Sequence, residues 1–396
     1  MTVQQQAISA KAKGTPRLFA TGFALFSMFF GAGNLIFPLL IGESVGANWG
    51  YAILGLGLTA VIVPFLGLAG MIFFQADCRR FFGRIGTVPG FMLLLLLQLI
   101  LGPFGVIPRL VTLMHAIVKP YLFDCSLLLF SLLAAGVVFL CSFRRQNLIG
   151  LLGVVLTPVL LVSLACLFFS GYWYSTPITA EAASPSSSFF QGLLGGYNTM
   201  DLIAAFLFAT VVLPHFQKEV DQDPSLDKKK ALSRRMFFSS AIAAGLLLFT
   251  YIGLSFISAY HGTSLGGGSE DLLGSIAFKL LGPTGGFIAA VAIVTACLTT
   301  AITLTLIFAD YLQKDLCKDK IHPLVSLGVT LLITTCFANL GFANIAAFLG
   351  PILQICYPGL IVLTVLNVIH YFTGFKTVKV PVFATFLGAA LFYFLG

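Results

Sequence analysis

The chain has 396 residues, of which 58% are apolar and only 9% are Asp, Glu, Lys or Arg. Soluble domains carry about 25% charged residues, so a soluble fold of this length could not keep its surface hydrated. The composition therefore excludes a soluble protein and indicates an integral membrane protein.

Long stretches without charge recur along the chain, and a membrane-spanning helix needs about 20 mostly apolar residues. The sequence predicts an all-α membrane protein with about eleven such helices rather than a β-barrel, because no stretch alternates apolar and polar residues. The longest uncharged run, 321–375, must hold two helices with a turn at Asn339–Asn344. The predicted spans are 18–42, 49–75, 88–118, 125–143, 147–171, 190–215, 236–260, 284–311, 323–340, 345–371 and 380–396.

The basic residues predict the orientation of these spans. When the N-terminus is cytoplasmic and the sides alternate, every Lys and Arg falls in a cytoplasmic segment except Arg109, Lys119 and Lys279. This asymmetry follows the positive-inside rule. The net charge of +8 is thus a feature of topology in a lipid bilayer, and it does not indicate nucleic-acid binding.

The residues of metal and nucleophile chemistry are dispersed. The eight cysteines form no CxxC or Cys/His cluster, and the five histidines lie far apart in the sequence. An enzyme needs a converging nucleophile, base or metal ligands. The sequence therefore predicts no enzyme and no enzymatic cofactor.

The first predicted span carries helix-breaking residues near its midpoint. Gly31-Ala32-Gly33-Asn34 is followed by Pro38, and glycine and asparagine are poor helix formers. Unwound backbone inside a membrane is tolerated only where it faces protein, water or a ligand. A small-residue packing motif is the alternative, but packing requires no amide at Asn34. We predict an unwound stretch that faces a ligand.

The sixth predicted span contains a second candidate break, GGYNTMD at 195–201, with the carboxylate of Asp201 inside the span. Transporters built from inverted repeats place such breaks in corresponding helices of their two halves, and spans 1 and 6 correspond in a five-plus-five arrangement. The predicted units are a cytoplasmic tail 1–16, a first repeat 17–173, an extracellular linker 174–189, a second repeat 190–372 and an additional helix 373–396.

The eighth predicted span is rich in threonine. Thr295, Thr299 and Thr303 share one helical face, and Thr300 lies beside Thr299. Threonine in a membrane helix often donates to the carbonyl four residues earlier, which needs no ligand. The density of hydroxyls also suits a small hard cation, with carbonyls from the unwound first span completing its ligands.

With these motifs the sequence resembles the branched-chain amino acid:cation symporter family (LIVCS, BrnQ type). The resemblance runs along essentially the whole chain, and it is carried by GFALFSMFFGAGNLIFPLLIG at 22–42, GPFGVIPR at 102–109, GYNTMD at 196–201 and ACLTTAI at 296–302. It implies a LeuT-type fold with broken helices 1 and 6 in the bacterial plasma (inner) membrane. It also implies sodium symport of leucine, isoleucine and valine by alternating access.

The resemblance implies roles for individual residues. The break in span 6 would lie at Ala205–Ala209, although Ala209 stands where the family usually has glycine, which predicts a shifted or milder break. The implied substrate-binding residues are Gly31, Ala32, Gly33, Asn34, Ala205, Phe206 and Phe208. The implied sodium ligands are Asn34 at one site, and Ser27, Phe30, Ala296, Thr299 and Thr300 at a second.

Physical chemistry narrows the substrate and the coupling ion. A charged substrate side chain would find no partner around the breaks, and burying it alone is costly, so an aliphatic zwitterion is favoured. Some proton-driven relatives of this fold place a lysine in span 5, but 146–180 contains neither Lys nor Arg, which favours sodium. A symporter or channel for another small neutral solute, including a proton-coupled one, stays the alternative.

Arg109 is the unusual cation, since it lies deep in the third predicted span, where a charge costs about 2.5–3.5 kcal/mol. Two interpretations stay open. Its long side chain extends to the outer surface, or it forms an intramembrane ion pair with Asp201.

Overall fold

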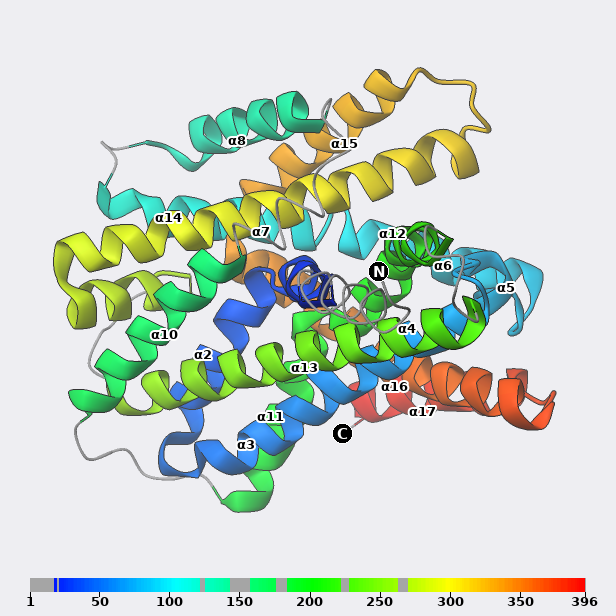
Figure 1. The fold of residues 1–396 in the computed structure, drawn as a ribbon, viewed down its shortest axis with the longest axis horizontal. Coiled ribbons are helices and arrows are strands. Elements are labelled where there is room, and N and C mark those ends of the chain that lie inside the picture. Colours follow the sequence, from blue (N-terminus) through cyan, green and yellow to red (C-terminus); the bar gives the residue numbers. More distant parts are fainter. Residues whose placement is uncertain are drawn as a thin grey trace, which may run out of the picture.

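The computed structural model describes residues 18–19, 21–121, 125–142, 157–175, 184–221, 228–262 and 270–395. Within these ranges the chain is helical, without a β-strand. Figure 1 shows the helices running across one another in a single bundle, with the long helix α14 (Leu272–Tyr311) crossing most of its width. The predicted tail 1–16 and part of the predicted linker lie outside the described residues.

The first half of the chain begins with helical residues 21–29, which end before Phe30. A π-helical turn at Leu58–Ile62 joins the two halves of the second span. The helices that follow the first break are α2 (Ala32–Val45), α3 (Trp49–Gly57), α4 (Val63–Phe73), α5 (Cys78–Gly83), α6 (Thr87–Leu101), α7 (Val106–Val118), α8 (Leu127–Ser142) and α10 (Thr157–Trp173).

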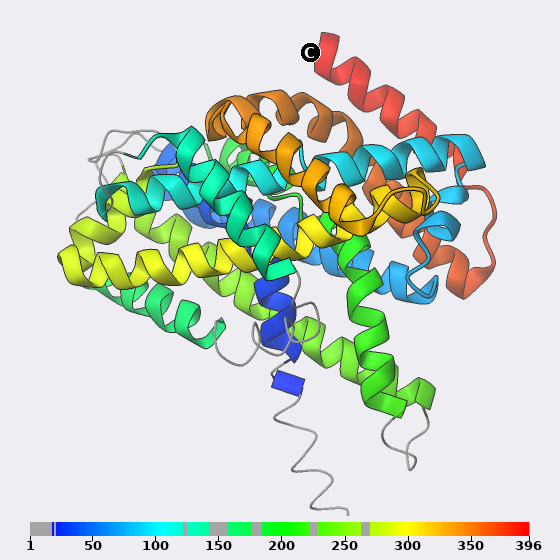
Figure 2. The same cartoon turned by 90° about the horizontal axis from the view of Figure 1, so that it is seen from above.

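The second half contains the longest helices, and α14 is kinked at Gly282, which precedes Pro283. The last helix packs on α16 and projects from the edge of the bundle in Figure 2. Besides α14, the helices of this half are α11 (Pro185–Thr199), α12 (Asp201–Asp221), α13 (Lys228–His261), α15 (Pro323–Ala338), α16 (Phe342–Thr373) and α17 (Lys379–Leu395).

Each predicted span overlaps at least one of these helices, and the predicted turn lies between α15 and α16, where Gly341 has φ +82°. Six helical stretches of the described chain are long and apolar enough to cross a membrane, as judged from their length and composition. Four shorter apolar helices accompany them. The expected all-α membrane architecture, with interrupted first and sixth spans, is confirmed.

The third span is interrupted as well, which the sequence analysis did not predict. Gly102-Pro103-Phe104-Gly105 separates α6 from α7. A Cβ atom at Gly105 would lie 2.1 Å from the carbonyl oxygen of Ile100, so only glycine fits this tight connection. The break turns α7 so that its first turn reaches the centre of the bundle, where α7 contacts α2.

Helices α3 and α11 pack along one another through glycines that carry no side chain into the contact. A Cβ atom at Gly192 would lie 1.8 Å from the carbonyl oxygen of Ala52, and one at Gly55 would lie 2.1 Å from that of Phe189. Small residues allow membrane helices to approach closely enough for van der Waals packing. This contact holds the start of the sixth span against the second, and α11 also contacts the central helix α2.

Gly192→Val should therefore destabilise the protein by more than the about 1–3 kcal/mol typical of overpacking, because the new side chain meets backbone. The measurement is the midpoint of thermal unfolding of the purified protein in detergent. Gly136→Val on α8 is the matched control, since no atom lies within 4 Å of a Cβ built there. Equal midpoints for the two variants would show that α3 and α11 do not approach this closely.

Candidate functional site

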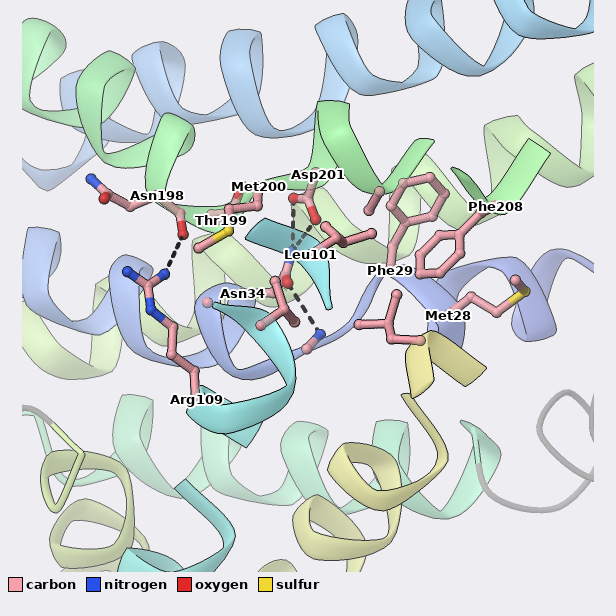
Figure 3. Close-up of a pocket in the computed structure, with 15 residues that line it drawn as sticks. Met28, Phe29, Asn34, Leu101, Arg109, Asn198, Thr199, Met200, Asp201 and Phe208 are labelled. Carbon is pink, nitrogen blue, oxygen red and sulfur yellow. Dashed lines mark hydrogen bonds between the residues drawn. The ribbon is translucent and has the colours of Figure 1, made fainter. Parts of the chain in front are cut away.

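Three interrupted spans meet at one cavity near the centre of the bundle. Residues 21–29 give way to α2, α6 gives way to α7, and α11 gives way to α12, and both sides of each break line the cavity (Figure 3). The last carbonyls and the first N–H groups of a helix have no intrahelical partner, and they carry its partial negative and positive charge. The cavity therefore faces backbone donors and acceptors at once.

The cavity is narrow. Its volume is about 20 Å³, counted over the positions that the centre of a water molecule can take, which is room for about one water. Its apolar wall includes Met28, Phe29, Leu101, Phe208 and Leu304, and the ring centroids of Phe29 and Phe208 lie 5.3 Å apart in an edge-to-face arrangement. A ligand larger than water requires these side chains to move apart.

Asn34 and Asp201 connect the breaks of the first and sixth spans. The Nδ2 atom of Asn34 donates to Asp201 and lies 2.8 and 2.7 Å from its two carboxylate oxygens, while Oδ1 of Asn34 accepts from the N–H of Gly31 at 3.1 Å. Tyr251 on α13 donates its hydroxyl to Oδ2 of Asp201 at 2.8 Å. All three polar side chains are buried. Hydrogen bonds to a carboxylate compensate part of the cost of burying its charge.

Arg109 reaches the same cavity from the first turn of α7. Only 1% of its surface is exposed, and its guanidinium lies 5.5 Å from the ring centroid of Phe37 and 5.4 Å from that of Phe342. Nη1 donates to the carbonyl oxygen of Asn198 at 3.2 Å. Both interpretations from the sequence are wrong: the side chain does not extend to the surface, and no ion pair joins it to Asp201, which accepts hydrogen bonds from Asn34, Tyr251 and Thr199.

The residues expected to form a second sodium site lie together between the first and eighth spans. Oγ1 of Thr300 lies 3.2 Å from the carbonyl oxygen of Ser27, 3.5 Å from that of Phe30 and 3.1 Å from that of Ala296. Oγ1 of Thr299 lies 2.8 Å from the carbonyl oxygen of Ala296. The structure thus gathers two hydroxyls and three carbonyls at the end of helical residues 21–29.

The break in the sixth span is not at Ala205–Ala209, as expected from the resemblance, because these residues are helical in α12. It lies at Met200, which has a left-handed conformation with φ +61° and ψ +20°. Alanine favours the helix, so nothing interrupts the chain at Ala209. Asp201 is instead the first residue of α12, where a carboxylate stabilises the positive end of a helix.

This shift decides which residues of α12 face the cavity. Asp201, Ala204 and Phe208 line it, at a spacing of three and four residues that puts them on one helical face. The predicted Ala205 and Phe206 face elsewhere, and the ring of Phe206 packs at 5.2 Å against both Phe81 and Phe82.

The break in the first span begins earlier than expected. Phe30 and Gly31 are unwound, whereas Ala32, Gly33 and Asn34 form the first turn of α2. Gly31, Gly33 and Asn34 line the cavity, and Ala32 does not. A Cβ atom at Gly33 would lie 3.0 Å from Cα of Thr199, so glycine lets α2 pack against the end of α11.

Two tyrosines near the cavity escaped the sequence analysis. Tyr251 binds Asp201, as described, and the hydroxyl of Tyr357 on α16 accepts from the N–H of Leu202 at 3.2 Å. The ring of Tyr357 stacks on that of Tyr197 with centroids 4.7 Å apart. Each is a tyrosine in a long apolar span, and this is only a weak sequence signal for a site residue. The hydroxyl finds a hydrogen-bond partner only because the fold brings the break of the sixth span beside it.

Two larger hollows lie on either side of the cavity. The first, called the α5 hollow, has a volume of about 390 Å³ and is lined by residues that include Arg79, Gln98, Val211, Ile307 and Asp315. Arg79 and Asp315 form an ion pair there. Gln98, Val211 and Ile307 follow or precede the cavity residues of α6, α12 and α14 by three positions, so about one helical turn separates this hollow from the cavity.

The second hollow, called the α11 hollow, has a volume of about 600 Å³ and lies between α2 and α11. Its lining includes Glu43, Ser44, Gln191 and Asn198, and Asn198 also lines the central cavity. The three spaces therefore follow one another through the bundle.

Comparison with known proteins identifies the family. A family model described as "Branched-chain amino acid transport protein" matches residues 15–394. The chain belongs to this family. It is 32% identical to the branched-chain amino acid permease BraB of Bacillus subtilis over 94% of this chain and 84% of that one. It is 30% identical to BrnQ of Corynebacterium glutamicum over 88% of this chain and 80% of that one.

Solved structures of transporters share the fold of this family member. The nucleobase-cation-symport-1 family transporter Mhp1, in a closed conformation with bromovinylhydantoin bound, has a TM-score of 0.60 at 16% identity, with 95% of this chain and 90% of that one covered. A Na+-coupled sialic acid symporter has a TM-score of 0.58 at 11% identity, with 94% and 88% covered. The protein is a multi-pass membrane transporter and not an enzyme, in agreement with its permease relatives.

Tyr251→Phe should destabilise the protein by about 1.5–3 kcal/mol, because the buried carboxylate of Asp201 loses a hydrogen-bond donor. The readout is the midpoint of thermal unfolding in detergent. Tyr260→Phe is the matched control, since Tyr260 lies on the same helix and its side chain is only partly buried. A midpoint for Tyr251→Phe equal to that of the control would contradict the hydrogen bond.

Proposed function

We propose that the protein imports leucine, isoleucine and valine together with sodium, by alternating access across the bacterial inner membrane. The observation that carries this proposal is the narrow cavity at which three interrupted spans present their helix ends, with a hollow on either side. A site near the middle of the membrane, formed by discontinuous helices, is the arrangement through which secondary transporters bind small solutes.

The chemistry of the cavity favours an aliphatic zwitterion. Helix N-termini attract a carboxylate, and the carbonyls at helix C-termini attract an ammonium group. Met28, Leu101, Phe208 and Leu304 offer apolar surface for an aliphatic side chain. The relatives named branched-chain amino acid permeases support the same substrate class. Discrimination among the three substrates is expected to be weak, since one methylene is worth about 1–3 kcal/mol.

The oxygens around Thr300 favour sodium as the coupling ion. Carbonyls of Ser27, Phe30 and Ala296 and the hydroxyls of Thr299 and Thr300 form an all-oxygen set of donors, which suits a hard cation. Binding there would bridge helical residues 21–29 and α14. A further sodium at Asn34 would share the amide oxygen that already accepts from Gly31, because a carbonyl oxygen has two lone pairs.

The positive-inside rule assigns the α5 hollow to the cytoplasm, since Arg79, Arg80 and Lys314 lie at that end of the bundle. The α11 hollow then opens to the outside. Import would require the wall at Asn198 to open first, and the one-turn wall of Leu101, Phe208 and Leu304 to open afterwards.

Thr300→Ala should raise the sodium concentration that gives half-maximal leucine uptake by about tenfold or more, as expected for the loss of one polar group worth about 1.4 kcal/mol or more. The measurement is uptake of labelled leucine into proteoliposomes over a series of sodium gradients. Thr295→Ala is the matched control, because the hydroxyl of Thr295 donates only within its own helix, to Val291 at 2.6 Å.

The same assay separates sodium from proton coupling. Leucine uptake should cease when choline replaces sodium, and a protonophore should leave sodium-driven uptake in place. Undiminished uptake in choline that a protonophore abolishes would reject sodium as the coupling ion, while the amino acid substrate would stand.

Alternating access predicts opposite changes of accessibility in the two hollows. In a variant without the eight native cysteines, Asn198→Cys should react with a membrane-impermeant thiol reagent from outside, and Thr210→Cys from the cytoplasmic side. Leucine with sodium should raise the reaction rate at one position and lower it at the other. A channel would instead leave both positions reactive at the same time.

A further inference from the structure

The guanidinium of Arg109 has hydrogen-bond donors without a partner at the wall of the cavity. Nη1 donates to the carbonyl oxygen of Asn198, whereas Nε and Nη2 are fully buried and have no hydrogen-bond partner among the residues that the structure describes. An arginine stays charged in proteins and has five N–H donors. A buried donor without an acceptor costs about 1–3 kcal/mol, and more for a charged group. The arrangement therefore needs a reason.

The two unpaired atoms form the side of the guanidinium that suits a carboxylate. The N–H bonds of Nε and Nη2 run parallel, so they can donate together to the two oxygens of one carboxylate. Phe37 and Phe342 lie over the guanidinium at 5.5 and 5.4 Å, and this contact with the aromatic rings stabilises the cation and holds its plane. The donor pair is thus fixed in place before any anion arrives.

Asp201 carries the opposite charge in the same cavity. Figure 3 shows Arg109 pointing to Asn198 and Asp201 pointing to Asn34, so the two charges approach the cavity from different helices without meeting. Asp201 accepts from neutral donors, the side chains of Asn34, Tyr251 and Thr199. None of these donors carries a charge, so the negative charge of Asp201 has no cationic partner among the described residues, and a cationic ligand would supply one.

We propose that Arg109 binds the α-carboxylate of the transported amino acid through Nε and Nη2, and that Asp201 neutralises its α-ammonium group. This inference rests on the proposed function and adds the residues that require both charges of the substrate. A lone anion at Arg109 would leave Asp201 without a cation, and an amine at Asp201 would leave Arg109 unpaired. A zwitterion satisfies both residues with one molecule, and burying an unpaired charge is costly.

The pair of charges therefore determines specificity for the amino acid backbone rather than for the side chain. A site that is built to bind a polar group rejects an analogue that lacks the group far more strongly than it discriminates one methylene. Leucinol, which lacks the carboxylate, and 4-methylpentanoate, which lacks the ammonium group, should both bind much more weakly than leucine.

The test is a thermodynamic cycle that combines changes in the protein with changes in the ligand. Binding of leucine, leucinol and 4-methylpentanoate is measured with purified wild-type protein, Arg109→Gln, Arg109→Lys and Asp201→Asn, in detergent with sodium, by the shift of the thermal unfolding midpoint over a ligand series. In the wild type, leucine should bind about 10- to 100-fold more tightly than leucinol, as expected for charge-assisted hydrogen bonds. In Arg109→Gln, the affinity for leucine should fall to about that for leucinol. The affinity of this variant for leucinol should stay within about threefold of the wild-type value.

The other variants complete the cycle. Asp201→Asn should reduce the preference for leucine over 4-methylpentanoate and keep the preference over leucinol. Arg109→Lys keeps the charge without the planar pair of donors, so an intermediate preference is expected. Lys119→Gln, which removes an exposed cation immediately after α7, is the matched control and should behave as the wild type.

Two failures can be told apart. A wild-type protein that leucine does not stabilise would reject the proposed substrate itself. If the wild-type protein binds leucine, and folded Arg109→Gln or Arg109→Lys keeps the wild-type preference for leucine over leucinol, only the proposed role of Arg109 is overturned. If Arg109→Gln does not fold, the preference measured in Arg109→Lys decides, and an unchanged preference there again counts against the proposal.

Discussion

The structure depends on one constraint: backbone polar groups exposed by a broken helix inside a membrane must find partners within the protein, because hydrocarbon offers none. Three breaks meet this constraint at the same place. The N–H of Gly31 donates to the side chain of Asn34, and the N–H of Leu202 donates to the hydroxyl of Tyr357. The carbonyl of Ser27 lies beside the hydroxyl of Thr300. Asn34 and Asp201 join the first and sixth breaks, and Arg109, after the third break, donates to the carbonyl of Asn198 at the sixth.

The same partners join the two halves of the chain. Asn34 belongs to the first span, whereas Asp201 and Tyr251 belong to the sixth and seventh. Thr300, in the eighth span, contacts the end of helical residues 21–29. A rearrangement at either contact therefore changes how one half is held against the other. Helical residues 21–29 end between these two contacts, so a shift of this segment would change both.

The sequence was sufficient for the fold and for part of the site, as particular residues show. Uncharged runs predict the spans because the cost of charge in a bilayer is large and local. Gly31 and Asn34 reveal the first break because glycine and asparagine weaken a helix wherever they stand. The Thr299–Thr300 pair was also predicted together with carbonyl partners that the structure brings close. These signals are local and need no knowledge of the neighbours.

The features that were missed depend on neighbours. Met200 has no intrinsic preference for a left-handed conformation, so its place as the break follows from Asp201 starting the next helix and from the contacts of that helix. The partners of Arg109 are two rings and a backbone carbonyl from three other helices, which no spacing in the sequence encodes. Pairing two opposite charges is the simplest expectation from sequence, and here the fold keeps them apart.

The thin wall between the cavity and the α5 hollow has an electrical consequence. Hollows that are open to solvent conduct ions, so the voltage across the membrane falls mainly over the remaining dry layer, which here is little more than a helical turn on one side of the cavity. One elementary charge that crosses the whole voltage gains or loses about 2.3 kcal/mol per 100 mV. A solute with no net charge crosses this layer without electrical work, whereas any accompanying cation crosses nearly the full field within a few side chains. The membrane voltage would then act mainly on the side chains between the cavity and the α5 hollow.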